Sequence, residues 1–270
     1  METMNVIFRT IIALVLVSCI GVAAEAAVPL TPGQITLETF STALTESLDL
    51  LDQSVNSVAG EFGVADMNIT SAESIVTKNK INTPGYAGIV LVNQNRVLPS
   101  LNPTYFTGPF DTGILNNAAV KDSVQYLKPR MSKEFEVAGS ERMAMIIRPV
   151  PVGDGIGAAV LLVVPWAFID GVTQPLINGT SIQCVVMQPD GTVLYASKPM
   201  ELTKIPPETF STEFSTFRDV KNAMMTQKEG TSVYELWRGD RTDPKVREAY
   251  WNTITLHNND WRVMVAEVIQ

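Results

Sequence analysis

The chain has 270 residues, of which 46% are hydrophobic and 18% are charged, so it can bury a substantial core and is not intrinsically disordered. Its 28 acidic residues outnumber its 20 basic ones, which gives a formal net charge of −8, and no long basic run interrupts this balance. That charge pattern argues against nucleic-acid binding. The length suits one large domain or two of ordinary size.

The N-terminal segment, residues 1–26, has the features of an export signal. Arg9 precedes the uncharged apolar run Ile11–Gly21, and Ala24-Glu25-Ala26 fits the small-residue rule for signal-peptide cleavage. Two alternatives stay open. Cys19 ends a stretch that resembles a bacterial-type lipobox and would then be lipidated, whereas an uncleaved membrane anchor would be short for a full span. All three predict that the rest of the chain functions outside the cytoplasm, secreted or anchored at its N-terminus.

The chain contains two cysteines, Cys19 in this segment and Cys184 in a later apolar run. After cleavage the protein would hold one thiol and no intramolecular disulfide. We interpret Cys184 as a thiol of the hydrophobic core.

A long amphipathic helix is predicted over residues 31–64. Thr31 can cap it, and Pro32 suits its first turn. Apolar residues then recur at steps of three and four, which is the spacing of one helix face: Leu37, Phe40, Leu44, Leu48, Leu51, Val55, Val58 and Phe62. The apolar face of so long a helix must pack either on a partner helix or on the backs of successive domains.

Two stretches with the same order of elements follow this helix. The first has a strand, turn and strand at 86–100, a stretch at 113–131 that is helical up to Pro129, and two apolar strands at 141–152 and 155–169. A linker is predicted at 170–180. The second stretch then has a hairpin at 184–197, a helix at 214–227, a strand at 232–237 and a closing strand pair at 248–268. The fold class predicted is α+β, with one long N-terminal helix followed by two similar domains.

This pattern resembles the double Cache family, in which an extracytoplasmic sensor places two PAS-like domains with antiparallel sheets along a long N-terminal helix. The resemblance rests on the apolar stripe from Leu37 to Phe62, on GIGAAVLLVV in the first repeat, and on MQPDGTVLYAS and YWNTITLHNNDWRVMVAEV in the second. It implies a membrane-distal Cache domain at 75–170 and a membrane-proximal one at 178–270. It also implies a pocket for a small molecule in the first domain, with amino acids, amines and small carboxylates among the ligands of the family.

The chain departs from the amino-acid-binding members of that family. Those members tend to use a tyrosine-arginine-tryptophan-tyrosine set and an aspartate on the last strand, which holds a ligand ammonium. The corresponding strand here, Ala158 to Val164, is wholly apolar, and Asp170 falls beyond it. Burying an ammonium group without a counter-charge costs several kcal/mol. We therefore expect a small carboxylate ligand rather than an amine or an amino acid.

The candidate ligand residues follow from strand alternation. Arg142 and Arg148 are predicted to share one face of their strand with Ala144 and Ile146, where Arg148 could form the floor of a carboxylate site. The alternative is that both arginines reach solvent from the ends of the strand.

Tyr105 and Tyr126 are the expected walls of this pocket. Tyr195, Arg238 and Tyr250 are the equivalent candidates for a pocket in the second domain.

Catalytic signatures are sparse. His257 is the only histidine and lies at a predicted turn, so the usual zinc sets are absent, and the sequence shows no nucleophile elbow, phosphate loop or dinucleotide fingerprint. No metal or cofactor is expected, and the protein is predicted not to be an enzyme.

Three functional interpretations remain. The leading one is an extracytoplasmic small-molecule-binding sensor module without its own cytoplasmic output, acting as a solute-binding or signalling accessory protein. It would work with a separate membrane receptor, and the long helix could support a homodimer. The others are a ligand-free structural or protein-interaction module and a secreted hydrolase that depends on carboxylates.

Overall fold

The computed structural model describes residues 30–64, 69–79, 81–93, 96–106, 112–136, 141–152, 155–197, 215–237 and 244–269. Every element described below lies in one compact unit, Pro32–Gln270, which is called the second unit because Met1–Thr31 is separate from it. Of the residues predicted to have a role, Cys19 and Arg238 fall outside the described residues. None of the described helices combines the length and the hydrophobicity needed to cross a membrane.

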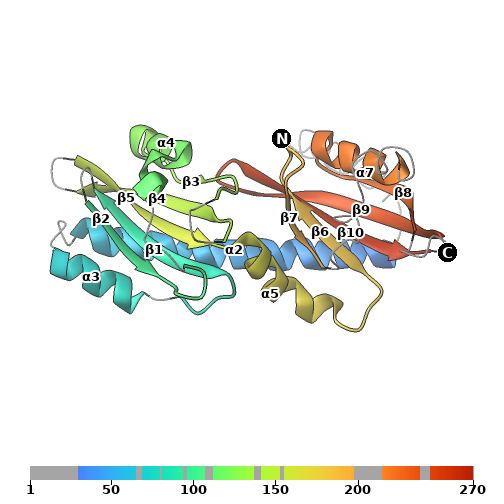
Figure 1. Cartoon of the computed structure of the whole chain (residues 1–270), viewed down its shortest axis with the longest axis horizontal. Coiled ribbons are helices and arrows are strands. Elements are labelled where there is room, and N and C mark those ends of the chain that lie inside the picture. Colours follow the sequence, from blue (N-terminus) through green and yellow to red (C-terminus); the bar gives the residue numbers. More distant parts are fainter. Residues whose placement is uncertain are drawn as a thin grey trace, which may run out of the picture. The chain divides into compact units, whose positions relative to one another are not determined.

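Helix α2 (Pro32–Val64) runs along both sheets of the second unit (Figure 1). The predicted apolar stripe is confirmed, because all eight of its residues are buried and belong to one large core cluster. That cluster also contains residues of both sheets, such as Ile146 and Val263, so the stripe packs along the backs of two successive domains.

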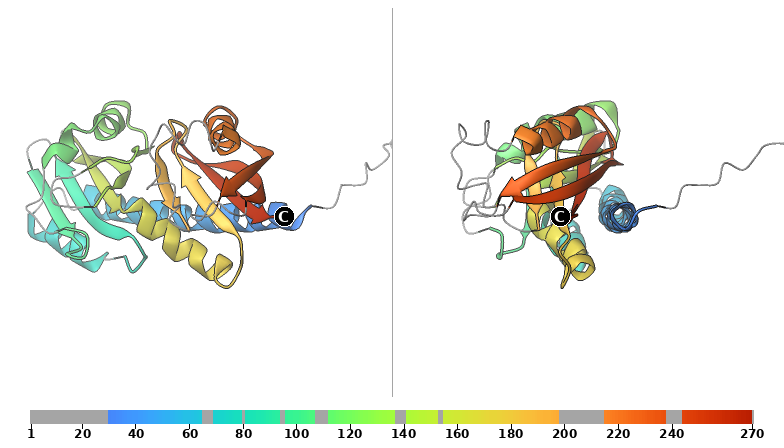
Figure 2. Two further views of the ribbon diagram at one scale, coloured as in Figure 1. Left: turned by 45° about the vertical axis from the view of Figure 1, so that its right-hand side comes forward. Right: turned by 90° about the vertical axis from the view of Figure 1, so that its right-hand side faces the viewer.

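The first half of the second unit, defined here as α3 to β5, holds a five-stranded antiparallel sheet in the order β2-β1-β5-β4-β3. Its elements are α3 (Ile69–Lys78), β1 (Tyr86–Asn93), β2 (Arg96–Leu101), η1 (Thr112–Asn116), α4 (Ala118–Tyr126), β3 (Arg130–Met131), β4 (Ala144–Val152) and β5 (Gly155–Val163). Side chains of one face, including Ile89 and Leu161, pack toward α2. Those of the opposite face, here called the outer face, pack with η1 and α4. Figure 2 shows α4 on the side of this sheet that faces away from α2.

The second half repeats this plan with the sheet order β7-β6-β10-β9-β8. Its elements are β6 (Gln183–Met187), β7 (Val193–Ala196), α7 (Ser215–Thr226), β8 (Gly230–Trp237), β9 (Pro244–Leu256) and β10 (Asn259–Val268). Strand β6 is buried on both faces, as its apolar run predicts, since Cys184 and Val186 face α2 while Val185 and Met187 lie under α7. The predicted α+β fold with two PAS-like sheets along one helix is therefore confirmed (Figure 1).

Three local predictions were wrong. The single helix predicted from Gly113 up to Pro129 is divided into η1 and α4, because Asn117 has an extended backbone and its side chain accepts a hydrogen bond from the Ala119 N–H at 2.9 Å. Helix α4 ends at Tyr126, because Leu127 adopts a left-handed φ of 53°.

The strand predicted at 155–169 ends at Val163, because α5 (Pro165–Ile177) begins at Pro165. The predicted linker at 170–180 is largely helical, since α5 continues through Pro175. Phe168 and Ile169 anchor α5 in the main core, and this packing outweighs the local helix-breaking residues.

Candidate functional site

The outer face of the first sheet is the surface on which the family resemblance leads us to expect a ligand. Its centre consists of fully buried apolar side chains from three neighbouring strands and from Met143, which precedes β4: Val90, Met143, Met145, Ile147, Ala158, Val160 and Leu162. Val120 of α4 and Ile114 of η1 cover it. A face of this composition can hold the apolar part of a small molecule or can be filled by the chain's own side chains.

Tyr105 is the predicted site residue that this face retains. It is half-buried against the apolar cluster, and its hydroxyl accepts a hydrogen bond from the Gly85 N–H at 3.3 Å. Asn102 fixes the preceding loop, because its backbone N–H donates to the Ala87 carbonyl at 2.8 Å and its side-chain amide donates to the Tyr86 carbonyl at 3.0 Å. Tyr105 therefore stays a candidate for contact with a ligand.

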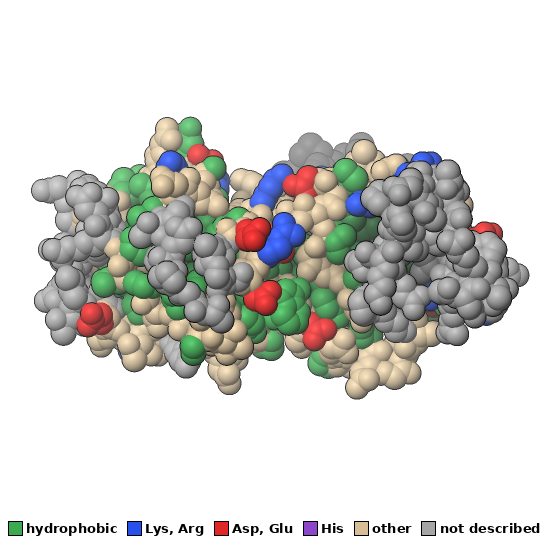
Figure 3. All heavy atoms as spheres, in the orientation of Figure 1, with side chains coloured by type: hydrophobic (Ala, Val, Ile, Leu, Met, Phe, Trp, Pro, Cys, Tyr) green, Lys and Arg blue, Asp and Glu red, His purple; other side chains and the backbone are tan. Residues whose placement is uncertain are grey.

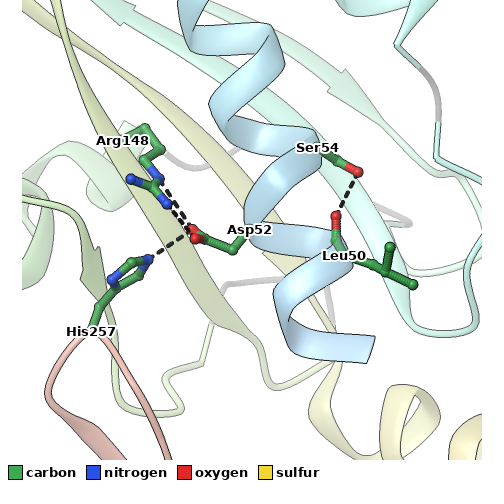
Figure 4. A network of polar contacts seen from close by, with 5 residues as sticks. All are labelled: Leu50, Asp52, Ser54, Arg148 and His257. Atoms are coloured by element: carbon green, nitrogen blue, oxygen red, sulfur yellow. Dashed lines mark hydrogen bonds and ion pairs between the residues drawn. The ribbon is translucent and has the colours of Figure 1, made fainter. Parts of the chain in front are cut away.

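The predicted role of Arg148 must be corrected. Its side chain lies on the α2 face of the sheet, where Nε donates to Asp52 Oδ1 at 3.1 Å and Nη2 also donates to Asp52 Oδ2 (Figure 4). The expected grouping of Ala144, Ile146 and Arg148 on one face is confirmed, but that face packs against the helix. Arg148 thus neither forms the floor of an outer pocket nor extends freely into solvent.

Arg142 and Tyr126 are also remote from a shared pocket. Nη1 of Arg142 lies 2.9 Å from Glu134 Oε2, and the side chain of Arg142 is 57% exposed while that of Glu134 is 4% exposed. Burial raises the pKa of the Glu134 carboxyl, and the neighbouring guanidinium opposes that shift. Tyr126 is 55% exposed at the end of α4, so the predicted pocket wall does not form there.

The two described candidates in the second half, Tyr195 and Tyr250, lie in the core that faces α2. Tyr195 is 6% exposed, and its hydroxyl donates to Asp170 Oδ1 of α5 at 3.0 Å. Burial is the main reason that the pKa of Tyr195 is raised to about 12. Tyr250 packs on Gly33, where a Cβ atom would lie 2.5 Å from the tyrosine Cε2. Both tyrosines therefore serve as packing residues between elements.

A polar network at the junction of the two halves was not predicted. His257 Nε2 lies 2.7 Å from Asp52 Oδ1, so Asp52 joins Arg148 of β4 to the turn between β9 and β10 (Figure 4). The only feature of the sequence that pointed to this network was the position of Asp52 on the polar side of the helix predicted over residues 31–64. His257 was correctly placed at a turn, but its partner is 205 positions away in the chain.

A groove of ≈ 450 Å³ lies between α2 and β9. Seven of its eight lining residues carry a hydroxyl, an amide or a carboxylate, and the eighth is an isoleucine: Ser41, Thr42, Thr45, Glu46, Asn252, Thr253, Ile254 and Thr255. Its Ser41 hydroxyl already donates to Asn252 Oδ1 at 2.7 Å. Within the described ranges, no group of three or more His, Cys, Asp and Glu side chains could hold a metal ion.

Comparison with known proteins gives matches in structure. No family model matches the sequence, and neither does any curated protein. An extracellular ligand-binding receptor from Desulfohalobium retbaense superposes with a TM-score of 0.67 at 16% identity, over 88% of this chain and 41% of the receptor chain. This chain thus spans less than half of that receptor.

Two chemoreceptor domains match over most of both chains. The ligand-binding domain of the Pseudomonas aeruginosa amino acid chemoreceptor PctB, in complex with L-Arg, has a TM-score of 0.58 at 12% identity, over 87% of this chain and 92% of its own. The sensory domain of the Campylobacter jejuni chemoreceptor Tlp3, with isoleucine bound, has a TM-score of 0.59 at 10% identity, over 87% and 90%. The resemblance predicted from the sequence is confirmed at the level of the fold, which is that of the double Cache sensor domains.

Proposed function

We propose that this protein is an extracytoplasmic sensor module that binds a small molecule over the outer face of its first sheet. The observation that carries the proposal is the double Cache fold, in which α2 occupies one face of both sheets and leaves the outer face of the first to η1, α4 and neighbouring loops. Solved proteins of the same fold include an extracellular ligand-binding receptor and two chemoreceptor domains with amino acids bound.

The ligand class is inferred from the described part of that face. The preference for a small carboxylate is abandoned, because Arg148 is engaged by Asp52 on the opposite face and because the chemoreceptor domains above hold amino acids. Met145, Leu162 and their neighbours favour a ligand with an apolar portion, and the Tyr105 hydroxyl is the polar group beside them.

Location and partners belong to the same proposal. Residues 1–26 would direct export, with signal-peptide cleavage, lipidation of Cys19 or an uncleaved anchor as the three routes. The module would then serve as a solute-binding or signalling accessory protein, with a separate membrane receptor as its partner. A homodimer through α2 would have to use its exposed side, where Ile35 and Leu50 are 53% and 63% exposed, because its apolar stripe is covered by the chain's own sheets.

A second candidate is a ligand-free interaction module. It is favoured by the complete burial of Val90, Met145, Val160 and Leu162 on the outer face, as expected where side chains fill their own pocket.

A thermal-shift screen of the purified protein against amino acids, amines and small carboxylates separates the two candidates. A ligand at about 100 times its Kd adds roughly 2.7 kcal/mol to the free energy of unfolding, which raises Tm by about 5–10 °C for a chain of this size.

Two matched variants locate the site. A hit should weaken in Tyr105→Phe, which removes the half-buried hydroxyl, and persist in Tyr126→Phe, which removes an exposed one. A folded protein that shows no shift with any compound would overturn the sensor proposal in favour of the interaction module.

A further inference from the structure

The side chain of Asp52 is the meeting point of three elements (Figure 4). It belongs to α2, and its carboxylate binds Arg148 of β4 in the first half and lies 2.7 Å from His257 in the second half. The side chains of Asp52, Arg148 and His257 are only 14%, 21% and 17% exposed. Polar contacts with so little exposure to water are weakened by solvent much less than surface contacts, so both contacts constrain the positions of their elements.

The turn between β9 and β10 is built to hold this position. His257 and Asn258 both have left-handed backbones, with φ values of 49° and 65°, as in the two-residue turns that match the twist of a β-hairpin. This conformation directs His257 toward Asp52, while the Asn259 side-chain amide donates to the Ser132 carbonyl of the first half at 2.7 Å.

Ser132 is in turn bonded to β4. Its backbone N–H donates to the Met145 carbonyl, and the Met145 N–H donates to the Ser132 hydroxyl, both at 2.9 Å. The Met145 side chain lies on the outer face of the first sheet. The turn is thus connected to β4 by two routes, through Asp52 to Arg148 and through Ser132 to Met145.

A second turn reinforces the junction. The Lys133 ammonium group donates to Asp190 Oδ2 at 2.7 Å, and Asp190 belongs to the turn between β6 and β7. Turns of the second half therefore hold two consecutive residues of the first half. Acidic and basic side chains gather near the middle of the face drawn in Figure 3.

The β9–β10 hairpin extends from this junction to the start of α2. The two strands are paired from Asn259↔Leu256 to Val268↔Arg247 without a bulge. At the far end, Tyr250 and Glu267 lie against Gly33, since a Cβ atom there would be 2.5 and 2.7 Å from their side chains. Because the backbone hydrogen bonds of this ladder are uninterrupted, a displacement at the turn is transmitted along the two strands to their far end.

We propose that Asp52 and the β9–β10 turn couple the two halves, so that a displacement of β4 moves the hairpin and, with it, the contact at Gly33. This rests on the proposed function, because the displacement of interest is the one that a ligand on the outer face would impose through Met145 and its neighbours. Because coupling between two sites is reciprocal, a substitution at the turn must also change the stability of β4.

Hydrogen exchange measured peptide by peptide on the full chain tests the coupling without any ligand. In Arg148→Gln, where the substitution lies in the first half, amides around Tyr250 and at the end of β10 should exchange about tenfold faster, as expected when a charge-assisted hydrogen bond is lost from the closed state. In His257→Asn, which keeps a residue suited to a left-handed backbone, the β4 amides should show the reciprocal increase.

Two references make the result decisive. Asp49→Asn changes an exposed carboxylate one turn earlier in α2 and should leave both regions unchanged. Helix α3, which packs on α2, β1 and β2, should keep its wild-type exchange in Arg148→Gln, which distinguishes coupling from a general loss of stability.

Faster exchange only beside the substituted residue, or a uniform increase throughout the chain, would overturn the coupling. Because no ligand is used, either result leaves the thermal-shift test of the sensor function unaffected.

Discussion

Replacement of Asp52 by asparagine isolates the energetic contribution of the junction. The variant keeps the volume and one carbonyl oxygen, but it removes the charge that faces Arg148 and His257. Breaking a fully buried pair by removing one partner costs about 3–5 kcal/mol, whereas an exposed pair contributes about 0–1 kcal/mol. With 14–21% of these side chains exposed, we expect Asp52→Asn to lower the free energy of unfolding by about 2 kcal/mol.

Urea denaturation and calorimetry measure this loss. For a chain of this size about 2 kcal/mol corresponds to a decrease in Tm of roughly 4–8 °C. The matched variant Asp49→Asn changes an exposed carboxylate of the same helix and should stay within about 0.5 kcal/mol of wild type. If both variants unfold at the same urea concentration, the junction contributes no more than a surface charge and the reasoning is refuted.

Three further predictions concern single residues. The hydrogen bond from Lys133 is the main reason that the pKa of Asp190 falls from 3.8 to about 2. The ionised carboxylate of Asp190 therefore stabilises the folded state above pH 3.8, and this contribution disappears as pH falls through about 2. In acid titrations, the free energies of unfolding of wild type and Asp190→Asn should converge in that window. Burial raises the pKa of the Cys184 thiol, so in a Cys19→Ser background the native protein should not react with a thiol reagent until it is unfolded in urea. Gly157→Ala should destabilise the folded protein by about 1–3 kcal/mol, because its Cβ would collide with the Val92 carbonyl. Gly60→Ala lies in an open part of α2 and should stabilise the protein by about 0.5–1 kcal/mol. Equal melting temperatures of the two variants would contradict this packing.

The elements that could be predicted are those whose side chains repeat with the period of the backbone. Every residue of the stripe from Leu37 to Phe62 is buried, because a 3.6-residue period over many turns leaves a single arrangement of the apolar face. The hairpin around Asp190 was equally local, since its turn residues are adjacent in the chain. The double PAS-like order of strands followed from these elements and from the family resemblance.

The site could not be predicted in the same way, because its contacts depend on which face of a strand meets which partner. Alternation grouped Arg148 with Ala144 and Ile146 correctly, yet it carries no information on whether that face meets solvent, a ligand or α2. The Asp52–His257 contact joins positions 205 residues apart, and neither residue has a distinctive neighbourhood in the sequence. In α5, Gly171 and Pro175 indicated a linker, but burial of Phe168 and Ile169 outweighs their local preference.

Ala158→Leu distinguishes a ligand-binding outer face from one that is filled by its own side chains. Ala158 is fully buried in β5, in register with Val92 of β1 and Pro149 of β4, so a leucine there must project into the space above the outer face. If side chains already fill that space, the larger residue should destabilise by about 1–3 kcal/mol through overpacking. If the space receives a ligand, leucine should be tolerated or should stabilise the unliganded protein, while any thermal-shift hit is abolished. Denaturation and the ligand screen on this one variant therefore give opposite results for the two functions, and a destabilised variant that still binds a hit would exclude the outer face as the site.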